Sequence, residues 1–196
     1  MNLHNQAVLA SEHDGIFIEA GCALGGSSIV IAAARSPSKK LYIYDVFGMI
    51  PPPSNADGAD VHERYSVIKS GNSPGIAGNK YYGYIENLID EVKSNFKSCK
   101  VSLSNVEFVK GLYQDTMKID EPVAFAHIDC DWYESVMVCL NQIIPNLVIG
   151  GRVVVDDYFA WSGCKAAVDE FFSDKQSFQI LFDDKIEKLT IVRTGE

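Results

Sequence analysis

The sequence lacks the features of a membrane, secreted or zinc-binding protein. No apolar run approaches the roughly 20 residues that cross a bilayer, so we expect no contact with a membrane. The chain does not start with a basic region followed by an apolar stretch, so we expect no signal peptide. Its five cysteines are scattered and form no CxxC pair, which argues against a disulfide framework or a zinc site. We therefore expect a cytoplasmic protein.

Positive charge is also scarce. The 196 residues carry 17 Lys and Arg against 26 Asp and Glu, a formal net charge of −9. Nucleic acid and anionic membrane surfaces would repel such a chain, so neither is the expected main partner. The length suits one domain with a sizeable core, and no internal repeat or second boundary divides residues 1–196. A homo-oligomer is compatible with this composition.

Short apolar runs alternate with segments of helical periodicity. The expected helices are near residues 26–34, 82–96, 133–147 and 165–172. The expected strands are residues 15–20, 41–47, 106–111, 123–129, 152–157, 178–182 and 188–193. Such alternation implies a parallel sheet with helices on both faces. The last two strands are joined by a polar turn too short for a parallel crossover, so they form an antiparallel hairpin.

This pattern predicts an α/β protein with a Rossmann-like, class I methyltransferase sheet, mostly parallel with a C-terminal antiparallel hairpin. Residues 48–80 interrupt the alternation with a stretch rich in Pro, Gly, Ser and Asn. Long segments of this kind in compact domains are often lids or binding loops. Residues 48–80 are therefore the candidate substrate or lid loop.

A glycine-rich segment, EAGCALGGSS at residues 19–28, follows the first expected strand and opens the first helix. Gly21 and Gly25 would let the backbone turn tightly and approach a ligand. The dinucleotide motif G-x-G-x-x-G is not met, because Ala23 stands at its second glycine. An acid two positions before the first glycine, here Glu19, is common in methyltransferases, whose cofactor has an ammonium group and no phosphate. A plain glycine-rich turn is the alternative.

Asp45 ends the second expected strand, 24 residues after Gly21. In nucleotide-binding α/β proteins, an acid about 20 residues after the glycines commonly binds ribose hydroxyls. Asp is also a frequent turn residue, which is the alternative interpretation. Together with the glycine-rich segment, Asp45 indicates a cofactor with a ribose.

Four carboxylates follow two apolar strands. Asp129 and Asp131 lie in HIDCDWYES, and Asp156 and Asp157 lie in VVVDDY. Ligands bind at the carboxyl ends of strands in open α/β sheets, and crowded carboxylates there require a cation or a shared proton. Oxygen ligands suit Mg²⁺ better than zinc. The alternative is that Asp131 or Asp157 caps the helix that follows. His127 is either a buried core residue or a base beside Asp129.

At these motifs the sequence resembles the macrocin O-methyltransferase-like family, bacterial enzymes that methylate hydroxyls on deoxysugars of macrolide and aminocoumarin antibiotics. The resemblance runs from about residue 15 to about residue 172. The matching segments are EAGCALGGSS, DVFGMIPPP, VEFVKGLYQDT, HIDCDWYES and VVVDDYFAWSGCKAAVDEF. Two departures are that only residues 1–14 precede the first expected strand, and that GLY at residues 111–113 replaces the usual Gly-Trp-Phe.

The resemblance implies S-adenosylmethionine as the methyl donor and a divalent cation, usually Mg²⁺. It implies Asp131 as the general base for the sugar hydroxyl. The metal ligands that it implies are Asp129, Asp156 and Asp157. The implied cofactor contacts are Glu19, Gly21, Ser27 and Asp45, with Tyr113 and Gln114 near the adenine.

The sequence thus predicts a metal-assisted O-methyltransferase whose acceptor is a small, carbohydrate-containing molecule. Two other functions stay open at this point. Asp129 to Asp131 also form a D-x-D pattern, which a nucleotide-sugar glycosyltransferase uses to bind metal, although that function leaves Asp45 unexplained. A non-catalytic binding protein could keep the same fold, although four crowded acids are costly without a role.

Overall fold

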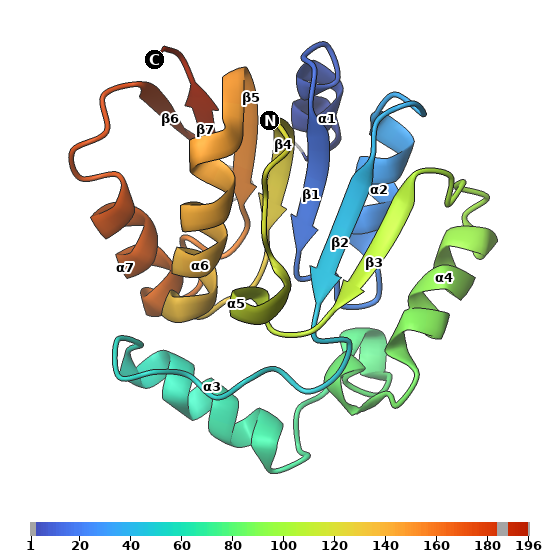
Figure 1. Cartoon of the computed structure of the whole chain (residues 1–196). Helices are drawn as coiled ribbons and strands as arrows, with labels where there is room; N and C mark the ends of the chain where they lie inside the picture. The colour runs from blue at the N-terminus through green and yellow to red at the C-terminus, as the bar shows by residue number, and fades with distance from the viewer. Residues whose placement is uncertain (1–2, 184–187, 196) are drawn as a thin grey trace.

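A computed structural model describes residues 3–183 and 188–195, which contain one seven-stranded sheet in the order β3-β2-β1-β4-β5-β7-β6 (Figure 1). The strands are β1 Ile16–Ala20, β2 Leu41–Asp45, β3 Val106–Lys110, β4 Val123–Ile128, β5 Leu147–Val155, β6 Phe178–Asp183 and β7 Lys188–Arg193. Strands β1 to β5 pair in parallel, and β7 pairs antiparallel with β5 and β6. The predicted mostly parallel sheet with a C-terminal antiparallel pair is confirmed. The turn expected at 183–187 falls largely on residues outside the described ones.

Helices cover both faces of this sheet (Figure 1). They are α1 Leu3–Ala10, α2 Gly26–Ala34, α3 Ala59–Lys69, α4 Leu88–Ser98, α5 Tyr113–Thr116, α6 Tyr133–Ile143 and α7 Ser162–Phe171, with 3-10 turns at Ile76–Gly78, Tyr82–Tyr84 and Ile144–Asn146. Two hydrophobic clusters result, one under α6 and α7 and one under α1, α2 and α4. Burial on both faces explains why β1 and β4 lack polar–apolar alternation. Within the described ranges, no helix has the length and apolarity of a membrane span.

Several boundaries differ from those expected. Strand β2 ends at Asp45 rather than at residue 47, because the Asp45 carboxylate accepts the Phe47 N–H at 2.6 Å and turns the chain. Helix α6 ends at Ile143 because Pro145 cannot continue it. Helix α4 starts at Leu88 instead of near residue 82, since residues 82–84 form a 3-10 turn.

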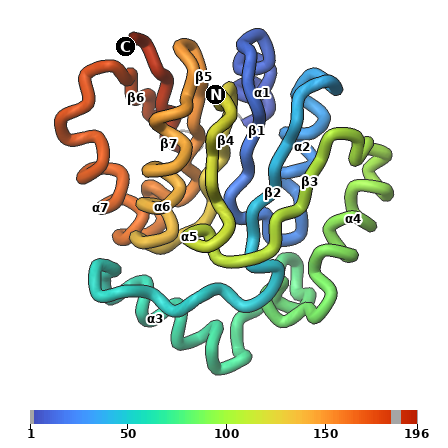
Figure 2. Tube along the Cα trace, in the orientation of Figure 1, coloured from blue at the N-terminus to red at the C-terminus, as the bar shows by residue number. Residues whose placement is uncertain are grey.

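Three helices were not expected, and the shortest of them is α5, which follows β3. Helix α1 lies in the short segment before β1 and packs on α2 and β5, behind the sheet and away from its carboxyl edge. Helix α3 lies inside residues 48–80, which the sequence presented as a loop. Figures 1 and 2 show this segment crossing beneath the carboxyl ends of the central strands, where a lid is expected to lie.

Segment 48–80 is attached to two helix N-termini by carboxylates. Asp57 accepts the backbone N–H of Tyr133 at 2.8 Å, at the start of α6, and that of Ser54 at 2.9 Å. Asp60 accepts the backbone N–H of Ser162 at 2.9 Å, at the start of α7. These contacts satisfy N–H groups that a helix leaves unpaired, and they place negative charge where the helix dipole favours it. The first half of the segment is therefore docked on the sheet domain.

Candidate active site

A pocket opens at the carboxyl edge of the sheet, beside segment 48–80. Its wall combines loops that follow β1, β2 and β4 with the start of α5. The residues singled out from the sequence that line it are Gly21, Asp45, Tyr113, Gln114, Asp129 and Asp131.

Gly21 and Gly25 are both required by the fold, independently of any ligand. Gly21 has φ +89°, and a Cβ there would lie 1.8 Å from the Asp129 carbonyl oxygen. Gly25 has φ +84°, and a Cβ there would lie 2.7 Å from Val92 of α4. Both positions therefore need glycine for conformation and for close packing. Of these two glycines, Gly21 lines the pocket and Gly25 does not.

Glu19 is fully buried at the end of β1. Its Oε1 accepts from Ser27 Oγ at 2.5 Å and lies 3.1 Å from His127 Nδ1. Its Oε2 is buried and has no hydrogen-bond partner among the described residues. An orphaned carboxylate oxygen is costly in a protein interior, so this atom is suited to a cationic donor such as an ammonium group.

His127 lies buried between two carboxylates, with its Nε2 3.4 Å from Asp156 Oδ1 and its Nδ1 bonded to Glu19. Burial disfavours the charged ring, but the hydrogen bonds to Asp156 and Glu19 outweigh it and raise the pKa of His127 to about 10. The ring is therefore a cation at neutral pH. His127 is a paired core residue, and a histidine that holds its proton this tightly is a poor general base.

Asp45 closes β2 at the pocket wall. Its Oδ2 accepts the Cys22 N–H at 2.8 Å and its Oδ1 accepts the Phe47 N–H at 2.6 Å. Burial raises the pKa of this carboxyl, and these backbone donors oppose the rise. Each carboxylate oxygen has a second lone pair, so Asp45 can still accept from two hydroxyls of a ribose.

Tyr113 and Gln114 open helix α5 on the same wall of the pocket. The Tyr113 ring is buried in the cluster under α6, and burial raises the pKa of its hydroxyl. Gln114 is exposed. Ser27 and Glu19, by contrast, are not among the residues that line the pocket, and Ser27 Oγ donates to Glu19 Oε1.

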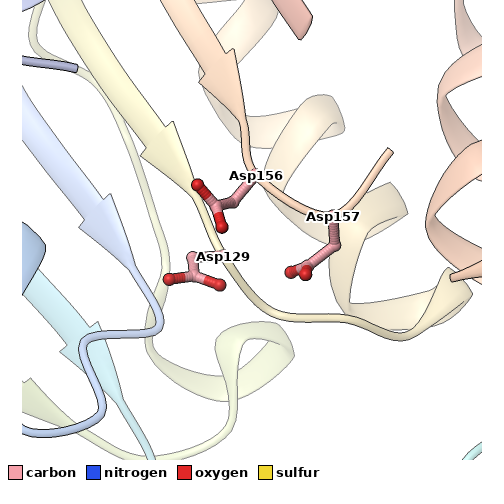
Figure 3. Close-up of side chains that lie close together, drawn as sticks. All are labelled: Asp129, Asp156 and Asp157. Atoms are coloured by element: carbon pink, nitrogen blue, oxygen red, sulfur yellow. The ribbon is translucent and has the colours of Figure 1, made fainter. Parts of the chain in front are cut away.

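Asp129, Asp156 and Asp157 converge at the ends of β4 and β5 (Figure 3). One oxygen of each lies within 4.8 Å of the others. The cause is register, since Ile128 pairs with Val155 and the Asp156 N–H donates to the Ile128 carbonyl at 2.9 Å. Asp157 Oδ2 is buried and has no hydrogen-bond partner in the described part of the chain. A set of oxygen donors with such an orphan fits a hard divalent cation.

The pKa values of the three carboxylates are shifted in different directions. Burial, with the neighbouring Asp157 and Asp156, raises the pKa of Asp129 well above its usual range, although His127 opposes this. Burial and Asp156 likewise raise the pKa of Asp157. Asp156 behaves oppositely, because hydrogen bonds from His127 and Lys188 outweigh its burial and lower its pKa to about 2. A bound cation would favour the ionised form of all three.

Asp131 lies on the loop between β4 and α6 with φ +61°. Burial and the nearby Asp157 and Asp129 raise its pKa well above the usual range. It does not cap α6. Trp132 occupies the N-cap position, and the side chain that accepts from the first turn is Asp57. The capping alternative for Asp131 is therefore wrong.

The sequence did not reveal two residues next to the site. Asp57 docks segment 48–80 on α6 across 76 residues of chain. Lys188 forms an ion pair with Asp156 across 32 residues. Neither belongs to a motif, and it is the tertiary structure that brings them near the other residues of the site.

Comparison with known proteins agrees with this geometry. A family model described as macrocin-O-methyltransferase (TylF) matches residues 2–186. Demethyldecarbamoylnovobiocin O-methyltransferase of Streptomyces niveus is 27% identical over 199 residues, 96% of this chain and 67% of the relative. A rhamnosyl-tetracenomycin-C 4'-O-methyltransferase of Streptomyces olivaceus is 28% identical over 172 residues, 85% of this chain and 61% of the relative. The chain thus spans about two thirds of these relatives.

Solved structures show the same fold. The O-methyltransferase NovP superposes with a TM-score of 0.77 at 25% identity, covering 98% of this chain and 79% of that one. The calicheamicin methyltransferase CalS11 has a TM-score of 0.70 at 17% identity, covering 99% and 76%. The family match sets aside the glycosyltransferase alternative. The chain belongs to the macrocin-O-methyltransferase family.

Proposed function

We propose that this protein transfers the methyl group of S-adenosylmethionine to a hydroxyl of a sugar or sugar-bearing small molecule, assisted by Mg²⁺ or a similar cation. The observation that carries the proposal is the convergence of Asp129, Asp156 and Asp157 within 4.8 Å, with Asp131 beside them at the pocket. Family membership supplies the reaction class. The names of the relatives, which include a rhamnosyl 4'-O-methyltransferase, supply the acceptor class.

In this proposal the cofactor occupies the wall formed by the loops after β1 and β2. The unpaired Oε2 of Glu19 accepts the cofactor ammonium, and the free lone pairs of Asp45 accept the ribose hydroxyls. Tyr113 and Gln114 contact the adenine from the start of α5. Because the sulfonium methyl is already activated, the protein has mainly to align donor and acceptor.

Asp129, Asp156 and Asp157 would hold the cation. A divalent cation there supplies Lewis acidity, which lowers the pKa of a hydroxyl bound to it. Asp131 accepts the hydroxyl proton, and segment 48–80 covers the acceptor and excludes water. The docking contacts of Asp57 and Asp60 keep the first part of that segment in place.

A methyl-transfer assay tests the proposal. Purified protein is incubated with labelled S-adenosylmethionine and a panel of deoxysugar-bearing acceptors, with Mg²⁺ or with a chelator. We expect label in a sugar hydroxyl of at least one acceptor, in the Mg²⁺ reactions alone. Asp129→Asn is the negative control, and cofactor binding by calorimetry confirms that it is folded. Transfer to nitrogen or carbon atoms, or undiminished transfer with chelator, would contradict the proposal.

A further inference from the structure

Lys188 is the first residue of β7 and lies at the rim of the carboxylate cluster. The antiparallel register that pairs Val155 with Leu189 sets Lys188 opposite Asp156. Its Nζ forms an ion pair with Asp156 Oδ2 and lies 3.5 Å from the Asp156 backbone oxygen. The family match ends at residue 186, so it does not extend to this lysine.

Asp156 differs from the other two carboxylates of the cluster because both of its oxygens face cations. Oδ1 lies 3.4 Å from His127 Nε2, and Oδ2 contacts Lys188. Within the described residues, neither Asp129 nor Asp157 has a salt bridge. The protein therefore supplies its own positive charge to one of the three oxygen ligands.

The two cations on Asp156 are not equally able to move. His127 is buried and also held by Glu19. Lys188 has a flexible stem, and its side chain is 32% exposed, so its ammonium can turn into water at little cost. If a cation binds at the cluster, Lys188 is the group that can leave Asp156.

We propose that Lys188 is an exchangeable counter-cation of the metal site. Its ammonium holds Asp156 in the metal-free protein and yields that oxygen when a divalent cation binds. Cation binding is then an exchange of charge, and Lys188 lowers the affinity because it competes for Asp156 and repels the incoming ion. This inference rests on the proposed metal site, and it adds that Lys188 sets the affinity of that site for the divalent cation.

The opposite role is physically reasonable and makes the test sharp. If Lys188 only orients Asp156 for the cation, its removal would weaken cation binding. The test is calorimetric titration of Mn²⁺ into the metal-free full-length protein, with bound Mn²⁺ also counted by electron paramagnetic resonance. The variants are Lys188→Met, Lys188→Gln and the charge-keeping Lys188→Arg. Lys40→Met is the matched control, since it removes an ammonium from the exposed ion pair with Glu121. Lys40 directly precedes β2, at the amino ends of the strands and away from the carboxylate cluster.

We expect Lys188→Met and Lys188→Gln to bind Mn²⁺ about 10-fold more tightly than wild type, or more, from the loss of one nearby positive charge. Lys188→Arg and Lys40→Met should stay within about threefold of wild type. Unchanged or weaker binding by both neutral variants, while wild type binds Mn²⁺, would overturn the role of Lys188 and leave the metal site standing. Absence of binding in wild type and in both neutral variants would overturn the metal site, and this inference with it.

Discussion

The cofactor side and the carboxylate side of the site differ in how their polar groups are paired. On the cofactor side, the two oxygens of Asp45 accept backbone N–H groups, and Ser27 bonds Glu19. On the carboxylate side, burial and a neighbouring carboxylate charge raise the pKa of Asp129, of Asp131 and of Asp157. The first half is mostly satisfied by the protein itself, whereas the second half is not.

This difference indicates how each half depends on its ligand. A wall whose donors and acceptors are paired keeps its shape when the cofactor leaves. Crowded acids reach low energy only when they share protons or bind a cation. We therefore expect the cofactor to bind a preformed surface and the cation to relieve unfavourable charge. The predictions below test this division.

The largest effect is expected at Asp131. Asn tolerates the left-handed conformation at φ +61° but is a very poor base, so Asp131→Asn should fold while losing about 10²- to 10⁴-fold in turnover. Cofactor affinity measured by calorimetry should not change. The matched control is Asp120→Asn, because Asp120 is an exposed acid that precedes β4, at the amino ends of the strands and away from the site. Turnover within a few-fold of wild type would remove Asp131 from the mechanism.

The next effect concerns the cofactor side. Losing a hydrogen bond to a charged group costs about 1.5–3 kcal/mol, so Asp45→Ala should weaken S-adenosylmethionine binding roughly 10- to 150-fold. It also leaves the buried N–H groups of Cys22 and Phe47 unpaired, which lowers stability. Calorimetry on protein shown to be folded by circular dichroism separates the two effects. Wild-type affinity in folded Asp45→Ala would exclude a ribose contact.

His127 gives the carboxylate half a dependence on pH. Its pKa is raised from 6.5 to about 10 by Asp156 and Glu19, against burial. Because the folded pKa is the higher one, this stabilisation is complete below pH 6.5 and is lost as the pH rises toward 10. The melting temperature of metal-free wild type should therefore fall as the pH rises from 6.5 to about 10. His127→Asn should show a flatter profile, and His62→Asn, at an exposed position in α3, should keep the wild-type slope. Parallel profiles for all three proteins would contradict the ionic pairing.

The smallest effect is expected where segment 48–80 docks. Asp57→Ala removes the acceptor at the start of α6 and should cost about 1 kcal/mol of stability. Asp57→Asn keeps one oxygen and should lose less. Urea denaturation measures the free energy of unfolding of both variants, provided that the dependence on urea concentration has the same slope as in wild type. Equal stability of Asp57→Ala and wild type would show that this contact does not hold the segment.

Much of the site could be predicted because it follows from strand order. Asp129 and Asp156 come directly after neighbouring parallel strands, so their convergence is a consequence of the sheet. Helix α3 was missed because its buried residues are few, with Val61 and Ile68 seven positions apart in a polar segment. Lys188 was missed because no local pattern links a strand residue to a carboxylate 32 residues away. Contacts made by tertiary docking leave no periodic signal.

One measurement tests the central claim most directly. Metal-free protein is prepared with a chelator, and both cofactor binding and methyl transfer are followed as Mg²⁺ is added. The account predicts that S-adenosylmethionine binds throughout with little change in affinity, because its wall is preformed. Methyl transfer should be absent at first and return with Mg²⁺ in wild type, but not in Asp157→Asn. Full methyl transfer by metal-free wild type would contradict the account.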